Sequence, residues 1–269
     1  MRRRPDFGTI SLNATLGVLA GACLILLTMP TIVVLMVSFT SGFSLRFPPP
    51  GYSLHWYAAL TDAWQLQFAA YNSFKVAAWT TLLSVVLGVA AALAIARSKR
   101  LSAAILDSIF MSPLILPGLA FGLAALIFFA LIGLPVSPLT LVIGHTIVCV
   151  PFVIRVTIAA LTQLDPSLLE SSASLGASRW YTFRRVTLPL IGSSILAGAF
   201  LAFMSSFDNI PVSLFLRNAG TDMLPIRMWQ DLESLLDVKI AAVSGVLIAI
   251  TLALMLVMER LAGLSKRLR

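Results

Sequence analysis

Charged side chains are scarce in this sequence, and that scarcity excludes a soluble globular domain. Only 11% of the 269 residues are Asp, Glu, Lys or Arg, whereas 59% are hydrophobic and the mean hydropathy is +0.96. A single core cannot bury so much apolar surface, so most of it must face lipid. The net charge of +8 does not indicate nucleic-acid binding, because the basic residues stand in short clusters between apolar runs.

Cysteines and common enzyme motifs are also few or missing. Cys23 and Cys149 both fall within apolar runs, so we interpret them as small packing residues rather than disulfide partners or metal ligands. The sequence has no Gly-x4-Gly-Lys-Ser/Thr phosphate loop, no His-Glu-x-x-His motif and no nucleophile elbow. We therefore predict that the chain is not an enzyme, that it needs no cofactor or metal, and that any ATP is hydrolysed by a separate subunit.

Long apolar runs dominate what is present. A bilayer-spanning helix needs roughly 20 apolar residues. Such runs predict an all-α, polytopic membrane protein that is a single transmembrane domain over residues 1–269, with six spans at about 12–40, 72–96, 105–131, 138–160, 190–214 and 238–260. The first run is too long for the core of a cleaved signal peptide, so we interpret it as a signal anchor. Pro113 and Pro117 are expected to bend the third span.

The distribution of Lys and Arg predicts the orientation. Cytoplasmic segments carry the excess of basic residues. One alternate set of segments holds thirteen, namely Arg2, Arg3, Arg4, Arg97, Lys99, Arg100, Arg179, Arg184, Arg185, Arg260, Lys266, Arg267 and Arg269. The other set holds only three, which are Arg46, Arg217 and Arg227. Both termini and the loop at 161–189 are therefore predicted to be cytoplasmic.

The loop at 161–189 has the pattern of two short helices set at an angle. Asp165 can cap the amides of a first helix, and Pro166 suits its first position. Gly176 can adopt the left-handed conformation that ends a helix, and Ser178 is placed to cap the next one. A simple connection between spans does not need this organisation. We interpret the loop as a docking surface for another protein.

The same loop resembles a known motif. Glu170-Ser171-Ser172, three residues, Gly176, nine residues and then Val186-Thr187-Leu188-Pro189 is similar to the EAA motif of permease subunits in binding-protein-dependent ABC importers. The resemblance implies the type I ABC importer permease fold and a coupling helix that sits in a groove of the ATPase. The candidate coupling residues are Glu170, Ser171, Ser172, Gly176, Leu188 and Pro189. Glu170 would meet polar or basic groups, and Gly176 would permit the sharp turn.

Further segments resemble the polyamine (spermidine/putrescine) type of permease, and specifically its C-type subunit. They are Asn72-Ser73, Pro113 with Pro117, and Ser206-Phe207-Asp208-Asn209, where Asn209 departs from the second acid that is common in that group. Asp208 falls within the predicted fifth span, where a carboxylate usually faces a cavity or a partner. We hypothesise that Asp208 and Asn209 line the path of a cationic solute. The alternative is that Asp208 pairs with a neighbouring span or sits at a tilted helix end.

The resemblance also implies partners and a mechanism. The partners are a cytoplasmic ATP-binding subunit dimer, a second homologous permease, a periplasmic solute-binding protein and membrane lipid, in the bacterial inner membrane. Transport would proceed by alternating access. An ion-gradient-driven secondary transporter, an assembly-only subunit, a homodimeric permease, and an ABC importer for ferric iron, an amino acid or a phosphonate stay open as alternatives. His145, buried in an apolar run, is interpreted as a hydrogen-bonded packing residue, with a proton relay as the alternative.

Overall fold

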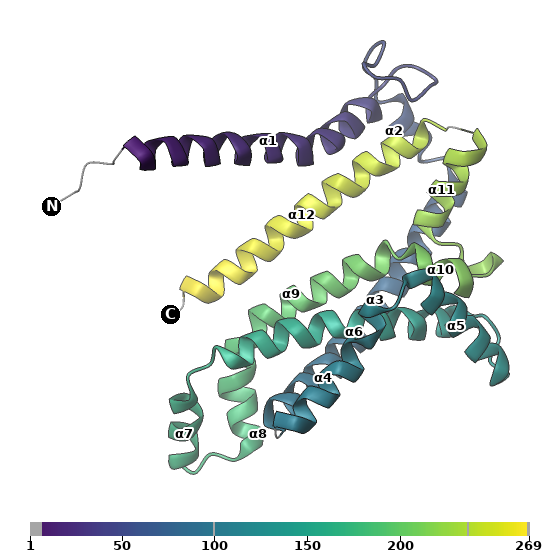
Figure 1. Ribbon diagram of the computed structural model, residues 1–269. Helices are drawn as coiled ribbons and strands as arrows, with labels where there is room; N and C mark the ends of the chain where they lie inside the picture. The colour runs from purple at the N-terminus through teal and green to yellow at the C-terminus, as the bar shows by residue number, and fades with distance from the viewer. Residues whose placement is uncertain (1–6, 99, 236, 268–269) are drawn as a thin grey trace. The chain divides into compact units, whose positions relative to one another are not determined.

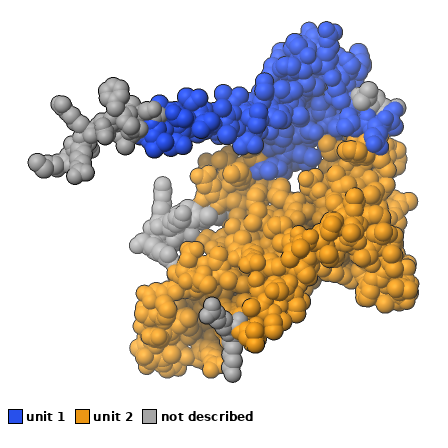
Figure 2. All heavy atoms as spheres, in the orientation of Figure 1, with its two compact units in different colours: residues 1–63, 231–251 blue, residues 64–230, 252–269 orange. Residues whose placement is uncertain are grey.

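Helices account for every regular element that the structure describes, which confirms the all-α class. The computed structural model describes residues 7–98, 100–235 and 237–267. The chain divides into two compact units (Figure 2). Unit 1 comprises Met1–Ala63 with Asp231–Thr251, and unit 2 comprises Trp64–Gln230 with Leu252–Arg269. Of the basic residues that predict the orientation, Arg2, Arg3, Arg4, Lys99 and Arg269 lie outside the described residues, so the orientation stays a prediction.

Unit 1 is built around the first helix and the start of the last. Its helices are α1 (Phe7–Ser38), α2 (His55–Ala59) and the first part of α12 (Lys239–Arg267). The Ser38 hydroxyl lies 2.8 Å from the Tyr57 hydroxyl, which ties the end of α1 to α2. Along the span Leu12–Ser38, α1 has no buried residue in its most apolar window, so the chain itself leaves that surface for lipid or another protein.

Unit 2 holds the remaining helices (Figure 1): α3 (Trp64–Arg97), α4 (Arg100–Ile115), α5 (Gly118–Leu131), α6 (Pro138–Thr162), α7 (Pro166–Ser174), α8 (Arg179–Thr182), the π-helix η1 (Phe183–Thr187), α9 (Leu188–Phe207), α10 (Ile210–Leu216), the 3-10 helix η2 (Ala219–Thr221) and most of α11 (Leu224–Leu235). Glycines let α3 and α9 pack closely on α6. A Cβ added at Gly88 would lie 2.7 Å from Cβ of Val153, and one at Gly198 would lie 3.2 Å from its Cα. Small residues at such crossings are the usual means of helix association in membranes.

The structure confirms that the chain has membrane-spanning helices, but two of the predicted spans are interrupted. Within the described ranges, five helices are long and apolar enough to cross a membrane, or six if one bent pair counts as a span. That pair shows the bend expected in the predicted span at 105–131, but as a complete break, since α4 and α5 meet at an angle of 102°. The break lies at Leu116 and Pro117, because proline cannot donate the next helical hydrogen bond and disfavours a helical residue before it.

The predicted span at 190–214 also needs correction. Helix α9 ends at Phe207 and α10 begins at Ile210, so the helix breaks at Asp208 and Asn209. The second span starts earlier than predicted, since α3 begins at Trp64 rather than near residue 72. Asn72 and Ser73 therefore lie inside a helix and not at its start. Both corrections have one cause, which is that hydropathy marks apolar stretches but does not locate caps and breaks.

Candidate functional site

The first helix of the loop at 161–189 begins as the sequence predicts. Asp165 is the N-cap of α7, and its Oδ1 accepts a hydrogen bond of 2.9 Å from the backbone N–H of Ser167. Pro166 takes the first helical position, where its missing N–H removes no helical bond. The bond from the Ser167 amide stabilises the carboxylate and so lowers the pKa of Asp165. The cap is therefore charged at neutral pH and lies at the positive end of the helix dipole.

Gly176 ends α7 in the predicted left-handed conformation. Its φ is +77°, and its N–H donates to the carbonyl of Ala173 at 2.9 Å. The N–H of Ala177 donates to the carbonyl of Ser172 at 3.1 Å, which completes the paired bonds of a Schellman motif. A Cβ added at Gly176 would meet nothing within 4 Å. Glycine is thus required here by the backbone conformation and not by crowding.

The second half of the loop runs directly into α9. Ser178 caps α8 by accepting a bond of 3.2 Å from the N–H of Tyr181. Next comes η1, in which the N–H of Leu188 reaches back to the carbonyl of Phe183. Pro189 follows at once, and its ring would press on the carbonyl four residues earlier, so a widened turn before it relieves the clash. The last two residues of the motif, Leu188 and Pro189, therefore begin α9.

A hydrogen bond that the sequence did not indicate joins the two arms of the loop. The hydroxyls of Ser172 and Thr182 lie 2.8 Å apart, and the side chain of Ser172 is buried. Ser171, its neighbour, is exposed. Both serines are predicted coupling residues, but the sequence does not distinguish their environments. The partner of Ser172 could not be foreseen, because a hydroxyl ten residues away becomes its neighbour only after the turn at Gly176 has formed.

The loop exposes large apolar side chains although it lies outside the spans. Glu170 is exposed, and among the described residues it makes no ion pair. Around it, five large side chains are exposed by 41% to 88%, and they are Leu168, Leu169, Leu175, Trp180 and Tyr181. Figure 1 shows α7 and α8 together beyond the ends of α6 and α9. A cluster of exposed apolar and aromatic side chains around one acid is typical of a protein-binding surface.

The second predicted site, Asp208 with Asn209, lies at the break between α9 and α10. At the end of α9, the backbone N–H of Asp208 donates to the carbonyl of Met204 at 3.1 Å. Its side chain is exposed on this chain, and no partner for its carboxylate occurs among the described residues. Asn209 caps α10, because its Oδ1 accepts a bond of 3.0 Å from the N–H of Val212. The two residues are thus adjacent but differ in role, since Asn209 has a structural partner and Asp208 has none.

Helix α10 is held against α5 and α6 by three glycines. A Cβ at Gly118 would lie 3.0 Å from Cβ of Pro211, and one at Gly122 would lie 2.7 Å from the Pro211 carbonyl oxygen. A Cβ at Gly144 would lie 2.5 Å from Cδ1 of Leu216. Gly118 starts α5 and Pro211 stands in the first turn of α10, so the two helix breaks of unit 2 lie next to each other. Two interrupted helices meeting at their breaks are a frequent form of a transport site.

His145 links both sides of the break. Its Nδ1 lies 2.9 Å from the hydroxyl of Ser206 on α9, and its Nε2 lies 3.0 Å from the hydroxyl of Ser213 on α10. The imidazole and both hydroxyl groups are buried. The prediction of a hydrogen-bonded packing residue is confirmed. The sequence could not identify Ser206 and Ser213 as partners of His145, because they lie 61 and 68 residues away along the chain.

Asn72 and Ser73 hold the segment that follows α10. The Asn72 side-chain amide donates to the carbonyl of Asp222 at 3.2 Å, and the Ser73 hydroxyl accepts a bond of 2.8 Å from the N–H of Leu224. An ion pair of 2.6 Å between Arg217 and Asp222 closes the same segment. These contacts fix the loop between α10 and α11 onto α3.

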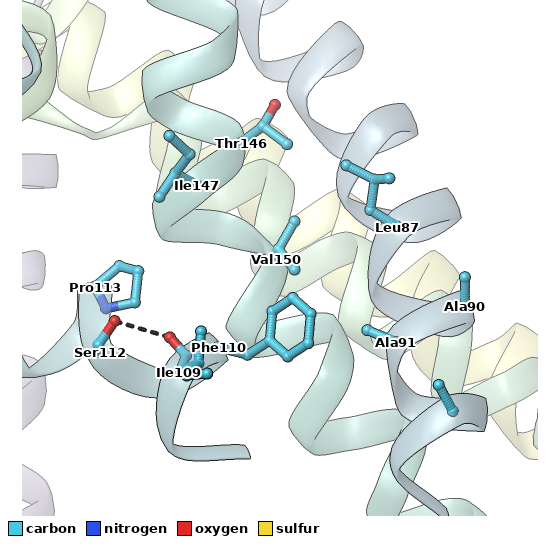
Figure 3. Close-up of a pocket in the computed structure, with 11 residues that line it drawn as sticks. Leu87, Ala90, Ala91, Ile109, Phe110, Ser112, Pro113, Thr146, Ile147 and Val150 are labelled. Atoms are coloured by element: carbon cyan, nitrogen blue, oxygen red, sulfur yellow. Dashed lines mark hydrogen bonds between the residues drawn. The ribbon is translucent and has the colours of Figure 1, made fainter. Parts of the chain in front are cut away.

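A cavity of about 680 Å³ lies between α3, α4 and α6 (Figure 3). Its walls are apolar apart from Ser112 and Thr146. Both hydroxyls are already bonded to their own helices, Ser112 to the carbonyl of Ile109 at 2.8 Å and Thr146 to that of Val142 at 2.7 Å. The cavity therefore offers no charged group to a solute, and its two hydroxyl donors are already used within their own helices.

Comparison with known proteins identifies relatives along most of the chain. The family model described as binding-protein-dependent transport system inner membrane component matches residues 84–268. The spermidine/putrescine transport system permease protein of Escherichia coli (strain K12) is 24% identical over 237 residues, which are 88% of this chain and 89% of that protein. A putative 2-aminoethylphosphonate transport system permease protein of Salmonella typhimurium (strain LT2) is 28% identical over 257 residues, which are 93% and 95% of the two chains.

The fold is also found in a solved structure. A chain of a bacterial ABC transporter involved in the import of the acidic polysaccharide alginate matches with a TM-score of 0.71 and 14% identity, covering 97% of this chain and 98% of that chain. This likeness supports the fold alone.

Proposed function

Since this chain belongs to the family of inner membrane components of binding-protein-dependent transport systems, we propose that its loop at 161–189 docks onto a separate ATPase and that Asp208 lies on the path of a protonated amine. The chain is a multi-pass permease subunit of an ABC importer and not itself the ATPase. The coupling role, the solute and the orientation in the membrane belong to the proposal.

The ordered loop with its exposed apolar surface supports the coupling role. Exposed leucine and aromatic side chains favour burial against a partner, by roughly 25 cal/mol for each Å² removed from water. The loop presents them on a frame fixed by the Asp165 cap, the Gly176 turn and the Ser172–Thr182 bond. It leads without interruption into α9. A displacement of α8 and η1 is therefore transmitted along α9 to the helix break, and α7 is linked to α8 through the turn at Gly176 and the Ser172–Thr182 bond.

The unpaired carboxylate of Asp208 supports an amine as the solute. A charged side chain facing lipid is costly, so an exposed carboxylate in a membrane subunit is expected to face water, a partner or a solute. The names of two relatives concern polyamines and an aminophosphonate, which share a primary amine. A protonated amine pairs well with one carboxylate. Asn209, whose oxygen caps α10, would contribute its amide group only at the edge of this site.

The proposed cycle follows from these two sites. A periplasmic binding protein delivers the solute to a pathway between this chain and a second, homologous permease. Closure of the ATPase dimer on ATP moves the coupling loop, and the loop passes this movement to the spans, so that access to the pathway alternates between the outer face and the cytoplasm. Both termini are cytoplasmic in this scheme, in the bacterial inner membrane. A homodimer of this chain is the alternative to the heterodimer.

The experiment that tests the proposal combines location and assembly. Ser171→Cys, in a chain whose two native cysteines are replaced, is expected to react with a membrane-impermeant maleimide only in inverted membranes. Gly133→Cys, in the outer turn, is the matched control and should react only in intact cells stripped of their outer membrane. Co-purification with a soluble ATPase from the same organism is expected for the wild type. Labelling of residue 171 from outside, or a wild-type chain that binds no such ATPase, would contradict the coupling role.

A further inference from the structure

The link at His145 joins α9 and α10 on either side of the break at Asp208 and Asn209. Ser206 stands on the last turn of α9, and Ser213 stands in the middle of α10. The imidazole of His145 on α6 contacts both hydroxyls, at 2.9 and 3.0 Å. We call these three residues the His145 clasp.

The chemistry of the clasp requires both serines. A neutral imidazole has one N–H donor and one nitrogen acceptor, and a hydroxyl serves as either, so two hydroxyls satisfy the ring completely. All three groups are buried, with His145 and Ser206 at 0% exposure and Ser213 at 1%. A buried polar atom without a partner is costly. Removing either serine therefore leaves a ring nitrogen unsatisfied, and removing the ring leaves two hydroxyls to find other partners.

The two helices joined by the clasp, α9 and α10, differ in what they are attached to. Helix α9 is continuous with the coupling loop through η1. Helix α10 is held in close backbone contact by Gly118 and Gly122 of α5, and by Gly144 of α6. Without a clasp, a displacement of α9 could be absorbed at the break, because only two residues separate the helices there. With the clasp in place, a displacement of α9 also moves α6 and α10.

We propose that His145 is a positioning residue that couples α9 to α10 across the break, and that it thereby holds Asp208 in place as the coupling loop moves. This inference rests on the proposed function and extends it. His145 does not contact the solute in this proposal. Its effect is to keep the hinge at Asp208 and Asn209 from bending freely, so that ATP-driven movement reaches the far side of the break.

The experiment uses the complete importer in proteoliposomes, with its ATPase, partner permease and binding protein. Uptake and ATP hydrolysis are measured together for the wild type, His145→Ala and His145→Gln. Putrescine, spermidine and 2-aminoethylphosphonate serve as solutes. His145→Ala is expected to lower uptake about tenfold while hydrolysis is retained, because buried hydrogen bonds are lost at the hinge but the ATPase contact is intact. His145→Gln should restore part of the uptake, since a carboxamide also has a donor and an acceptor.

The serines provide the decisive control. Ser206→Ala and Ser213→Ala each delete one bond with little change in volume, so they report on the clasp even if His145→Ala does not fold. Each is expected to lower uptake partly while ATP hydrolysis is retained. In a chain that already carries His145→Ala, Ser213→Ala should lower uptake no further. Thr146→Val is the matched control. It removes a buried hydroxyl beside His145 that bonds only to the carbonyl of its own helix, and it should behave as the wild type.

The outcomes separate this inference from the proposed function. A wild-type importer that takes up none of the three solutes contradicts the amine assignment. The clasp is then tested by hydrogen exchange of residues 208–216. His145→Ala should accelerate this exchange about tenfold. Wild-type uptake and exchange in the Ser206→Ala and Ser213→Ala chains would overturn the clasp and leave the proposed function standing. Effects of His145→Ala and Ser213→Ala that simply add would overturn it as well.

Discussion

The hydroxyl of Ser172 lies 2.8 Å from that of Thr182, so the second small residue of the coupling motif joins the two arms of its loop. The alanine found at this position in the family motif could not form such a bond. In this chain the arms are therefore held by side chains as well as by the turn at Gly176. The bond is local to the loop, and its loss is expected to loosen the loop without changing its surface.

Replacing Ser172 by Ala tests this bond. One buried hydrogen bond contributes about 1 kcal/mol, so hydrogen exchange of residues 166–182 should accelerate about fivefold while the ATPase still co-purifies. Ser171→Ala is the control, since its side chain is exposed, and it should leave the exchange rates unchanged. Unchanged exchange in Ser172→Ala would show that the bond does not hold the arms together.

The left-handed backbone at Gly176 predicts a graded series. Gly176→Asn, Gly176→Ala and Gly176→Val should weaken co-purification of the ATPase in that order, with Ala costing about 1 kcal/mol and the β-branched Val more. Gly133 has a φ of +72° and equally empty surroundings, in the turn on the opposite side of the membrane in our orientation. Gly133→Ala should therefore carry a similar conformational cost and leave ATPase binding intact. Equal losses at the two positions would mean that the effect is global.

The exposed carboxylate of Asp208 predicts a defect in uptake and not in assembly. Asp208→Asn removes the charge at nearly constant size, and loss of one charge-assisted bond should reduce amine uptake by about 10- to 100-fold. Asp208→Glu should retain part of the uptake. Complex formation should be normal in both, as should uptake in the control Asp62→Asn, which alters an exposed acid before α3. Normal amine uptake by Asp208→Asn would remove Asp208 from the path.

The contact of α10 with α5 predicts that Gly122 is intolerant of a methyl group. A Cβ there would press on the carbonyl of Pro211, which is backbone and cannot rotate away. Overpacking of this kind costs about 1–3 kcal/mol. Gly122→Ala should lower the midpoint of thermal unfolding of the purified chain, whereas Gly192→Ala, with nothing within 4 Å of its added Cβ, should not. Equal midpoints for the two variants would contradict this packing.

The cap at Asp165 predicts a pH dependence for the start of α7. Its pKa is lower in the folded loop than in an unfolded chain, because the backbone N–H of Ser167 stabilises the carboxylate. The stabilisation is therefore complete above the ordinary carboxyl pKa, near 4, and is lost as the pH falls through the lowered value. Hydrogen exchange at residues 167–169, compared at matched pH with Asp165→Asn, should rise only in the wild type on acidification. A parallel rise in both chains would exclude the carboxylate as the cause.

The local features of the coupling loop could be predicted because each depends on residues a few positions apart. Asp165, Gly176 and Ser178 perform the predicted caps and turn, and each contact spans at most five residues. The break at Asp208 was not predicted, although Pro211 gave a hint of it. An apolar run of helix length looks the same whether or not one residue within it caps a second helix.

What the sequence by itself determined is the class of molecule and the local structure of the loop at 161–189. Scarce charge and long apolar runs require lipid, and the caps of the loop are set by neighbouring residues whose hydrogen bonds do not depend on the rest of the fold. Only the tertiary structure decided that His145 joins Ser206 to Ser213, that Ser172 bonds to Thr182, and that three glycines seat α10. Those contacts depend on how close separate segments come to one another, and that distance is fixed only when the helices have packed.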